Sequence, residues 1–446
     1  MLKNYLKVAF KVLGRNKFYT FISLFGISFT LMVLMLTIAF IQNELGANKP
    51  LSQKEKILLV PGLRMEGYAR EEIVEIDSTM VDGAWKYDTT KTENILEDQI
   101  NSTSNSWVGN KFYENHIKDI KTAALTSVFS PMQSIDVFPN DRKLTLTTNA
   151  TDANYWRIFD FEFVEGQPFS DAAIENQAFQ AIMSKSAAQQ YFGKKASYLG
   201  EVVTWGKLQF EITGIVKDIN TSIPHLKHDI FIPYTHLPPS LLDYGWGQFG
   251  NMQLALLGSS SKQLETIRSD FRFIEENFEV QEEGYDKLTI KERTIEELYA
   301  NNVLQNQERG SDKTLRWIVL VALLLFILIP TINLINLNST RIMERSAEIG
   351  VRKAFGAHTG NLMSQFLLEN VVLTGLGGLI GLGLTFFAMN WLNNSVWMEN
   401  TQLAFNPNIF IYSLIVVLLF GICSGLIPAW RMSKMDVAKA IKRNQL

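Results

Sequence analysis

Hydrophobic positions gather into four long stretches that are almost free of charge, and the sequence between them is ordinary and polar. A helix needs about 20 mostly apolar residues to cross a membrane, and each stretch is apolar on every face rather than along one stripe. The pattern predicts four transmembrane helices, over residues 18–43, 317–340, 366–394 and 408–430. The first stretch is too long for a cleaved signal peptide and no small-residue cleavage site follows it, so we expect a retained anchor.

Lysine and arginine residues in the short flanks predict the orientation of these helices. The N-terminal flank, the loop after the second stretch and the C-terminal tail are all basic, and basic flanks stay in the cytoplasm. Both termini are therefore expected inside, with residues 43–316 outside. That outer segment holds 40 acidic and 28 basic residues, so the chain's net charge of -3 conceals an acidic external domain.

The external domain, residues 44–312, has the composition of an α+β fold. Apolar residues spaced by three and four predict a helix over 261–277, between β-rich runs at 252–256 and 287–291. A second strand–helix–strand unit is expected from 56–60, a helix around 107–117, and 122–129. Residues 131–245 are interpreted as a separate β-rich lobe, and 285–312 as a helix leading into the second span.

Chemical motifs are sparse. The chain contains no G-x-x-x-x-G-K-[ST] phosphate loop, no H-E-x-x-H and no G-x-S-x-G. Its single cysteine, Cys423, excludes an internal disulfide. His225, His228, Asp229 and His236 are close enough in sequence to bind a metal, although an ordinary loop is the simpler interpretation. We therefore expect no catalytic residues, no metal and no cofactor in this chain.

Glycines in the third stretch indicate close helix packing. Gly377 and Gly381 form a small-xxx-small pair, which lets two helix backbones approach each other. The pattern does not distinguish a contact within the chain from one between two chains.

The cytoplasmic loop, residues 341–358, carries a dense mixture of apolar and charged positions. Val351 and Phe355 lie on either side of Arg352 and Lys353, and Gly356 is placed to end a short helix. An amphipathic helix along the membrane surface is predicted. A helix that only anchors the span would have the same pattern.

The run EIGVRKAFGA, from Glu348 to Ala357, resembles the signature of MacB/FtsX/LolC-type permeases of ABC transporters. In that family the matching segment is a coupling helix that docks on a cytoplasmic ATPase. The resemblance assigns this role to Glu348, Ile349, Gly350, Arg352, Lys353, Phe355 and Gly356. The tail 431–446 is similar to the family's ending, although Met435-Asp436 replaces a common proline and Ile441 a common leucine.

Further segments extend the resemblance over nearly the whole chain. Residues 1–17 resemble the family's cytoplasmic amphipathic helix, and 155–234 resemble the MacB periplasmic core. The implied fold is four transmembrane α-helices with a large α+β periplasmic domain between the first two. That domain would comprise a Porter-like lobe, 44–130 with 246–300, and a Sabre-like lobe, 131–245.

The resemblance also implies a mechanism, mechanotransmission in a bacterial inner membrane. Two permeases, identical or paralogous, would each pair with an ATPase subunit that binds ATP and Mg, and its closure would move the periplasmic domains. The missing phosphate loop fits versions in which the ATPase is a separate chain. Efflux or export is favoured, with a periplasmic adaptor and outer-membrane channel as further partners and no nucleic acid. Lipoprotein release, control of cell-wall hydrolases, and a membrane-anchored sensor or scaffold are the alternatives.

Overall fold

The computed structural model divides into two units, Met1–Gly46 with Lys313–Leu446, and Ala47–Asp312. It describes residues 14, 17–46, 49–82, 84–205, 207–219, 226–244, 247–306, 309–344, 351, 355, 359–395, 403 and 405–433. The second unit is inserted in the sequence of the first, after its first long helix.

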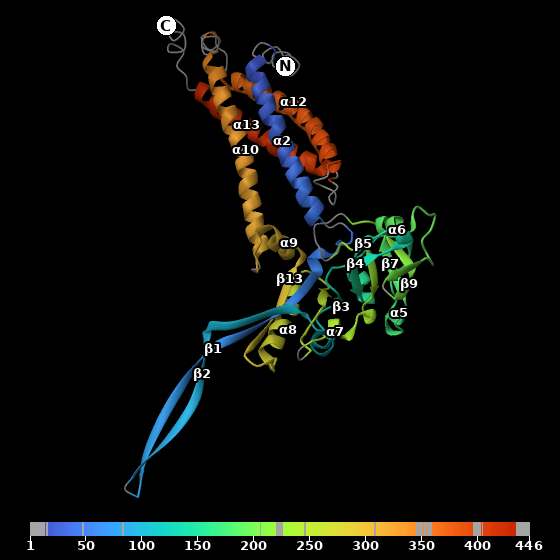
Figure 1. The fold of residues 1–446 in the computed structure, drawn as a ribbon. Coiled ribbons are helices and arrows are strands. Elements are labelled where there is room, and N and C mark those ends of the chain that lie inside the picture. The colour runs from blue at the N-terminus through green and yellow to red at the C-terminus, as the bar shows by residue number, and fades with distance from the viewer. Residues whose placement is uncertain are drawn as a thin grey trace. The chain divides into compact units, whose positions relative to one another are not determined.

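The first unit is built from long helices: α2 (Lys17–Leu45), α10 (Ser311–Glu344), α12 (Thr359–Asn393) and α13 (Pro407–Ser433). In Figure 1, α2, α12 and α13 lie side by side, and Ile27, Leu31 and Leu373 are buried in a shared core. Two helical segments are long and apolar enough to cross a membrane, Lys17–Asn43 and Met363–Asn393, with a shorter apolar run at Pro407–Leu419. Within the described residues, two of the four predicted spans meet this test.

Hydroxyl side chains are accommodated in α2 by bonding to the helix itself. Thr30 Oγ1 donates to the Gly26 carbonyl at 2.7 Å, and Thr37 Oγ1 donates to the Val33 carbonyl at 2.8 Å. A hydroxyl satisfied in this way can sit in an apolar environment without an unpaired polar group.

The second unit contains a mixed sheet in which neighbouring strands follow the order β11-β2-β1-β12-β3-β5-β10-β7-β9-β6, with β13, β4 and β8 pairing on β1, β5 and β9. The strands are β1 (Ile57–Val81), β2 (Ala84–Val108), β3 (Leu125–Phe129), β4 (Gln133–Val137), β5 (Leu144–Thr151), β6 (Phe163–Gly166), β7 (Gln180–Ser184), β8 (Val202–Trp205), β9 (Leu208–Val216), β10 (Ile230–Pro233), β11 (Phe249–Gly250), β12 (Gln253–Leu257) and β13 (Lys287–Thr294). Only β10–β5 and β7–β9 pair in parallel among the described strands. The segment 131–245 joins the rest of the sheet where β3 meets β5, at Phe129 and Thr151.

Short helices cover this sheet. They are α3 (Asn110–Phe112), α4 (Ala153–Ile158), α5 (Asp171–Glu175), α6 (Lys185–Phe192), α7 (Pro239–Leu242), α8 (Gln263–Asn277) and α9 (Ile295–Leu304), with single turns η1 (Lys54–Lys56), η2 (Tyr113–Ile117), η3 (Pro139–Asp141) and η4 (Tyr234–His236). Two large apolar clusters form the core, one containing Leu58, Phe210 and Phe271. The other is rich in aromatic rings, including Tyr155 and Phe231.

The helix predicted over 261–277 is confirmed as α8, whose Leu264, Ile267 and Phe271 are buried. The helix predicted over 285–312 is confirmed only from Ile295 to Leu304 and from Ser311, and it is wrong over 287–294, where the β-rich run predicted at 287–291 is confirmed. Leu288, Ile290 and Glu292 are buried with a period of two, so this part is strand β13. Helix α9 follows, and it ends where Gln305 adopts a left-handed conformation with φ 54°.

A long β-hairpin occupies residues 57–108, where only the run 56–60 was predicted to be a strand. The predicted helix around 107–117 is confined to α3 and the turn η2, from Asn110 to Ile117. In the outer hairpin, polar and apolar residues alternate on strands that cover no core, so the hydropathy of the segment is that of a loop. Figure 1 shows the hairpin projecting from the rest of the second unit.

Candidate functional site

Most of the predicted coupling segment, including Glu348, Ile349, Gly350, Arg352, Lys353 and Gly356, lies outside the described residues. Val351 and Phe355 are described. The Phe355 N–H donates to the Val351 carbonyl at 3.1 Å, which is the bond of one helical turn. Phe355 is 87% exposed and Val351 47% exposed, so Phe355 presents an apolar surface that the described residues leave uncovered.

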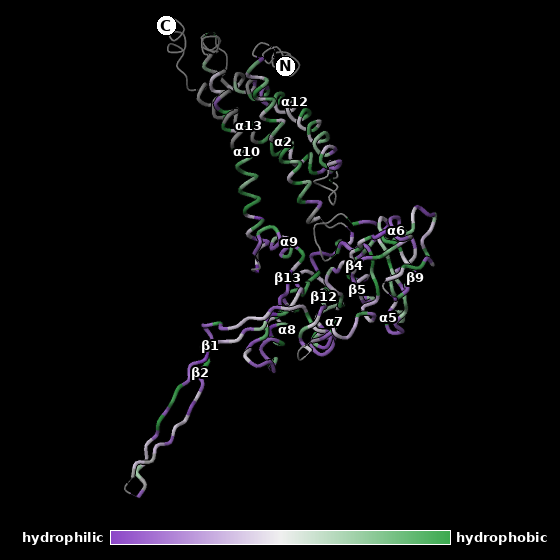
Figure 2. Tube along the Cα trace, in the orientation of Figure 1, coloured by the Kyte–Doolittle hydropathy of each residue, from purple (hydrophilic) through white to green (hydrophobic). Residues whose placement is uncertain are grey.

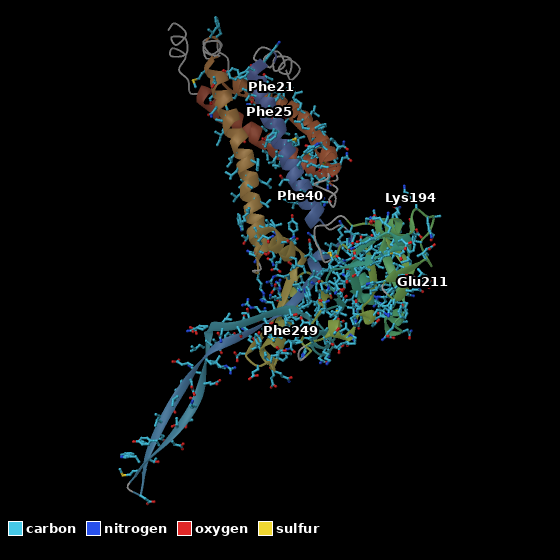
Figure 3. All side chains as sticks on the ribbon, viewed as in Figure 1. Phe21, Phe25, Phe40, Lys194, Glu211 and Phe249 are labelled. Atoms are coloured by element: carbon cyan, nitrogen blue, oxygen red, sulfur yellow. The ribbon has the colours of Figure 1, made fainter. Side chains whose placement is uncertain are left out.

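The phenylalanines of α2 form a separate exposed stripe. Phe21 and Phe25 stack with ring centroids 6.4 Å apart, and Phe25 and Phe29 at 5.8 Å. Phe21 is 67% exposed and Phe25 56% exposed, and both are labelled on α2 in Figure 3. Because residues three and four apart share a helix face, the stripe is suited to contact lipid chains.

The opposite side of α2 packs on α12 through the predicted glycine pair. A Cβ at Gly377 would lie 2.6 Å from Ile27 Cγ2, and one at Gly381 would lie 2.9 Å from the Ser28 carbonyl oxygen. Both glycines therefore allow a contact within the chain that a larger residue would not permit. Figure 2 shows the apolar character of these helices.

Helix α13 packs on the same part of α12 by a similar device. A Cβ at Gly421 would lie 2.6 Å from Thr374 Oγ1, and Thr374 is buried. Close approach strengthens the many small dispersion contacts that hold helices together in a membrane. The bundle α2–α12–α13 is thus tightly packed by small residues.

A network of charges surrounds the beginning of α10 in the second unit. Glu292 on β13 is 1% exposed and accepts a bond from Arg309 Nη2 at 2.7 Å. Glu297 on α9 accepts from Arg268 Nη2 at 3.0 Å and from the Gly310 N–H at 3.3 Å. These bonds fix the residues that immediately precede α10 to β13 and α9.

A second ion pair lies where β1 begins. Lys54 is 8% exposed, and its Nζ lies 3.1 Å from Glu296 Oε1 on α9. Leu58 pairs with Thr294 at the adjoining ends of β1 and β13. The chain thus enters and leaves the second unit at the paired strands β1 and β13, and the Lys54–Glu296 ion pair links the segments next to them.

A cleft of about 440 Å³ opens beside this strand pair, with basic and aromatic side chains in its wall. Lys291, Arg293, Trp107 and Tyr244 line it, and Lys291 Nζ donates to Asn105 Oδ1 at 2.5 Å. Burial, and then the charges of Arg64 and Arg293, lower the pKa of Lys291. Such a cleft suits an anionic or polar ligand group. The sequence does not predict it, because its walls come from four separate segments.

The histidine-rich loop has no metal geometry in the part that the structure describes. His236 Nε2 lies 3.0 Å from the Ala178 carbonyl, and His228 is buried near Phe231. His225 lies outside the described residues. No group of three or more histidine, cysteine, aspartate or glutamate side chains among the described residues is placed to hold a metal ion.

The chain combines long apolar helices with an inserted α+β unit. Two family models match the chain. The MacB-like periplasmic core domain matches residues 20–272, more than half of the sequence, and the FtsX-like permease C-terminal model matches residues 320–437. The chain belongs to the family of MacB-like ABC transporter permeases.

Curated relatives agree with this assignment. The uncharacterized ABC transporter permease YknZ of Bacillus subtilis is 24% identical over 78% of this chain and 83% of its own length. The probable syringafactin export ATP-binding/permease protein SyfD of Pseudomonas syringae pv. tomato is 23% identical, covering 82% of this chain and 54% of its own. The macrolide export ATP-binding/permease protein MacB of Escherichia coli K12 is 22% identical, covering 70% and 45%. The chain therefore spans only about half of the relatives named ATP-binding/permease proteins.

Solved structures give weaker likenesses. The extracellular domain of YknZ matches with 20% identity and a TM-score of 0.32, covering 41% of this chain and 89% of that one. The periplasmic region of MacB from Actinobacillus actinomycetemcomitans matches with 10% identity and a TM-score of 0.35, covering 56% and 93%. At these scores neither likeness adds to the family assignment.

Proposed function

We propose that this chain is the permease subunit of an ABC transporter that couples ATP hydrolysis in a partner ATPase to motion of its periplasmic domain. The observation that carries the proposal is the pair of family matches, one spanning α2 and the inserted domain and the other spanning α10, α12 and α13. The sequence contains no phosphate loop, so ATP and Mg would be bound by the partner. The permease would be non-catalytic.

The membrane topology in this proposal has four spans, α2, α10, α12 and α13, with both termini in the cytoplasm of a bacterial cell. The basic flanks support this orientation. The coupling segment between α10 and α12 then faces the ATPase. The exposed Phe355 supports a docking role, because a buried aromatic anchor is a common centre of protein interfaces.

Motion would pass from the bundle to the external domain through two connections. One follows α2 into β1, and the other precedes α10 at Arg309 and Gly310. The bonds from these residues to Glu292 and Glu297, and the Lys54–Glu296 pair, support a stiff joint at the β1–β13 strand pair. A displacement at the start of α10 would then reach the sheet through residues that are already bonded to it.

Export is the proposed task, since SyfD and MacB are named as export proteins. A periplasmic adaptor and an outer-membrane channel would complete such a route, and a second permease would complete the membrane part. The basic cleft at Lys291 and Arg293 is the proposed contact for a polar or anionic group of the substrate or adaptor.

Charge reversal at the coupling segment tests the proposal. We expect Glu348→Lys combined with Arg352→Glu to leave the protein in the membrane but to abolish its stimulation of the partner ATPase in liposomes. Phe355→Ala should weaken ATPase co-purification at least ten-fold. The matched control is Phe387→Ala, because Phe387 is 74% exposed on α12 outside the coupling segment.

Two results would overturn the proposal. If impermeant reagents label residues 341–357 and 44–312 from the same side of the membrane, a cytoplasmic motor cannot reach the coupling segment. If no ATPase co-purifies with the unmodified chain, a membrane-anchored sensor or scaffold explains the sequence better.

A further inference from the structure

The outer part of the long hairpin is a two-stranded ribbon, which we define as residues 69–81 of β1 and 84–96 of β2. Its register runs without a bulge from Ala69 opposite Leu96 to Val81 opposite Ala84, and no third strand pairs with it among the described residues. At about 3.3 Å per residue the ribbon is roughly 40 Å long. Isolated two-stranded hairpins are only marginally stable in water, so a ribbon of this length needs something to pack against.

The register divides the ribbon into two faces, because residues directly opposite each other point to the same side. One side, the apolar face, carries most of the large apolar side chains. It contains Val74 (47% exposed), Ile76 (65%), Met80 (60%), Trp85 (57%), Tyr87 (66%) and Ile95 (45%). The other side, the acidic face, carries Glu71, Glu75, Asp77 and Asp88, with Ile73 at 42% exposed.

The two faces differ in whether their carboxylates form ion pairs. On the apolar face both carboxylates are paired: Glu93 lies 3.2 Å from Arg70, and Glu72 lies 2.5 Å from Lys91. The acidic face has no ion pair within the described residues.

Moreover, Asp77 lies directly opposite Asp88 on the acidic face. On the apolar face Glu72 also lies directly opposite Glu93, but each has a cation partner. Like charges placed in this way are destabilising, so Asp77 and Asp88, which have no ion pair within the described residues, are stabilised by hydration. The acidic face is therefore the solvent face of the ribbon, and the apolar face is suited to burial.

We propose that the apolar face packs against the same face of a second copy of this chain. This inference rests on the proposed function in one respect, since it takes two permeases to lie together in one membrane. A two-fold axis normal to that membrane brings like residues of the two ribbons level with each other. The interface needs no second type of surface, because each apolar face is the complement of the other.

Area favours a tethered second copy over a free partner. At 45–66% exposure, the six large apolar side chains amount to roughly several hundred Å², a patch large enough to mark an interface. That is less than the roughly 800 Å² per partner of a typical stable complex. Two copies already held in one membrane need less area, because their effective concentration is high.

Charge is compatible with self-association. Packed sheets lie about 10 Å apart, so the two acidic faces would be on the outside and separated by more than the Debye length of about 8 Å at physiological salt. Their repulsion is largely screened, whereas burial of the apolar face is not affected by screening.

The neighbouring residues Thr89 and Thr90 provide a matched test, since Thr89 lies opposite Ile76 on the apolar face and Thr90 lies opposite Glu75 on the acidic face. The full chain carries Cys423→Ser, which removes its only cysteine, and then either Thr89→Cys or Thr90→Cys. Two differently tagged copies are expressed together, and membranes are treated with a short bismaleimide. We expect a cross-link between the two tags for Thr89→Cys, and at least ten-fold less for Thr90→Cys. Adding Ile76→Lys to Thr89→Cys should reduce the cross-link at least ten-fold, whereas Glu75→Lys should not.

Equal cross-linking from both faces overturns the inference, and so does exclusive cross-linking of Thr89→Cys to a different protein. Co-purification of the two tags and of an ATPase, measured without cross-linker, separates this inference from the proposed function. If both co-purify and Thr89→Cys still gives no cross-link, the ribbon inference alone fails. If neither co-purifies, the proposed function fails with it.

Discussion

Replacing Gly381 by alanine tests the packing of α12 on α2 with a single methyl group. The new Cβ would lie 2.9 Å from the Ser28 carbonyl oxygen and 3.1 Å from Leu31 Cβ. The carbonyl belongs to the backbone and cannot rotate away, so the two helices must separate slightly. We therefore expect Gly381→Ala to destabilise the bundle.

The magnitude follows from two opposing terms. Forcing a methyl group into a close-packed contact costs about 1–3 kcal/mol, and replacing a helical glycine by alanine returns about 1 kcal/mol. Gly383, on the same helix, has no atom of the described residues within 4 Å of an added Cβ, apart from its own chain neighbours and helix backbone. Gly383→Ala therefore has only the favourable term, and the two variants should differ by about 1–3 kcal/mol.

The assay is reversible unfolding of the purified full chain in mixed micelles, followed by tryptophan fluorescence and repeated for the parent and both variants. Gly383→Ala should equal or exceed the parent in free energy of unfolding, and Gly381→Ala should fall below it. If both variants are equally stable, α12 does not approach α2 at Gly381 and the packing argument is refuted.

Three further predictions concern separate parts of the chain. In α13, the Cβ added by Gly421→Ala would lie 2.6 Å from Thr374 Oγ1, and this contact should lower the free energy of unfolding by about 1–3 kcal/mol. Thr374→Ala leaves only a Cβ at 3.5 Å, so Gly421→Ala should lose most of its effect in the Thr374→Ala background, which a double-mutant cycle measures. Burial raises the pKa of Asp152 to about 6 despite hydrogen bonds from Ser127 and Tyr155. The folded state therefore keeps a proton on Asp152 that the unfolded chain releases near pH 4, so the free energy of unfolding should fall by about 2–3 kcal/mol as the pH rises from 4 to 7. Asp152→Asn should remove this pH dependence in denaturant titrations. At the connection before α10, Arg309→Ala should destabilise more than Glu292→Ala. It leaves the Glu292 carboxylate, which is 1% exposed, without its partner at 2.7 Å, whereas Glu292→Ala leaves an Arg309 side chain that is 50% exposed and can be hydrated. Thermal unfolding of the two variants measures the difference, and a larger loss for Glu292→Ala contradicts it.

The long apolar helices were predictable because a helix that contacts lipid must be apolar over its whole length. The apolar segments within α2 and α12 agree with the runs predicted over 18–43 and 366–394. The glycine pair was recognised from its spacing, but its partner was not, since Ile27 and Ser28 lie some 350 residues away in the sequence. Contact partners at that separation have no local signal.

The external domain was predictable only where a strand or helix covers the core. Helix α8 has a regular apolar period, so it was identified. The ribbon was not, because its two faces are both exposed in a single chain and its alternating residues, such as Val74, Glu75 and Ile76, have no core beneath them. Glu292 misled the prediction over 285–312 in a related way. In the sequence a glutamate such as Glu292 is interpreted as solvated, because its ion pairs with Arg309 and Arg268 are visible only in the structure.

In the proposed mechanism the strand pair β1–β13 matters because both covalent connections between the long helices and the inserted unit lead to it. β1 begins after α2, β13 ends before α9 and α10, and Leu58 of the first pairs with Thr294 of the second. The proposed motion would therefore reach the backbone hydrogen bonds between β1 and β13 first, next to the buried Lys54. β1 continues from this pair over 25 residues, and its register with β2 shifts at Gly67–Tyr68 and Tyr68–Ala69, so the motion would act on the inner part of β1 before it reached the ribbon.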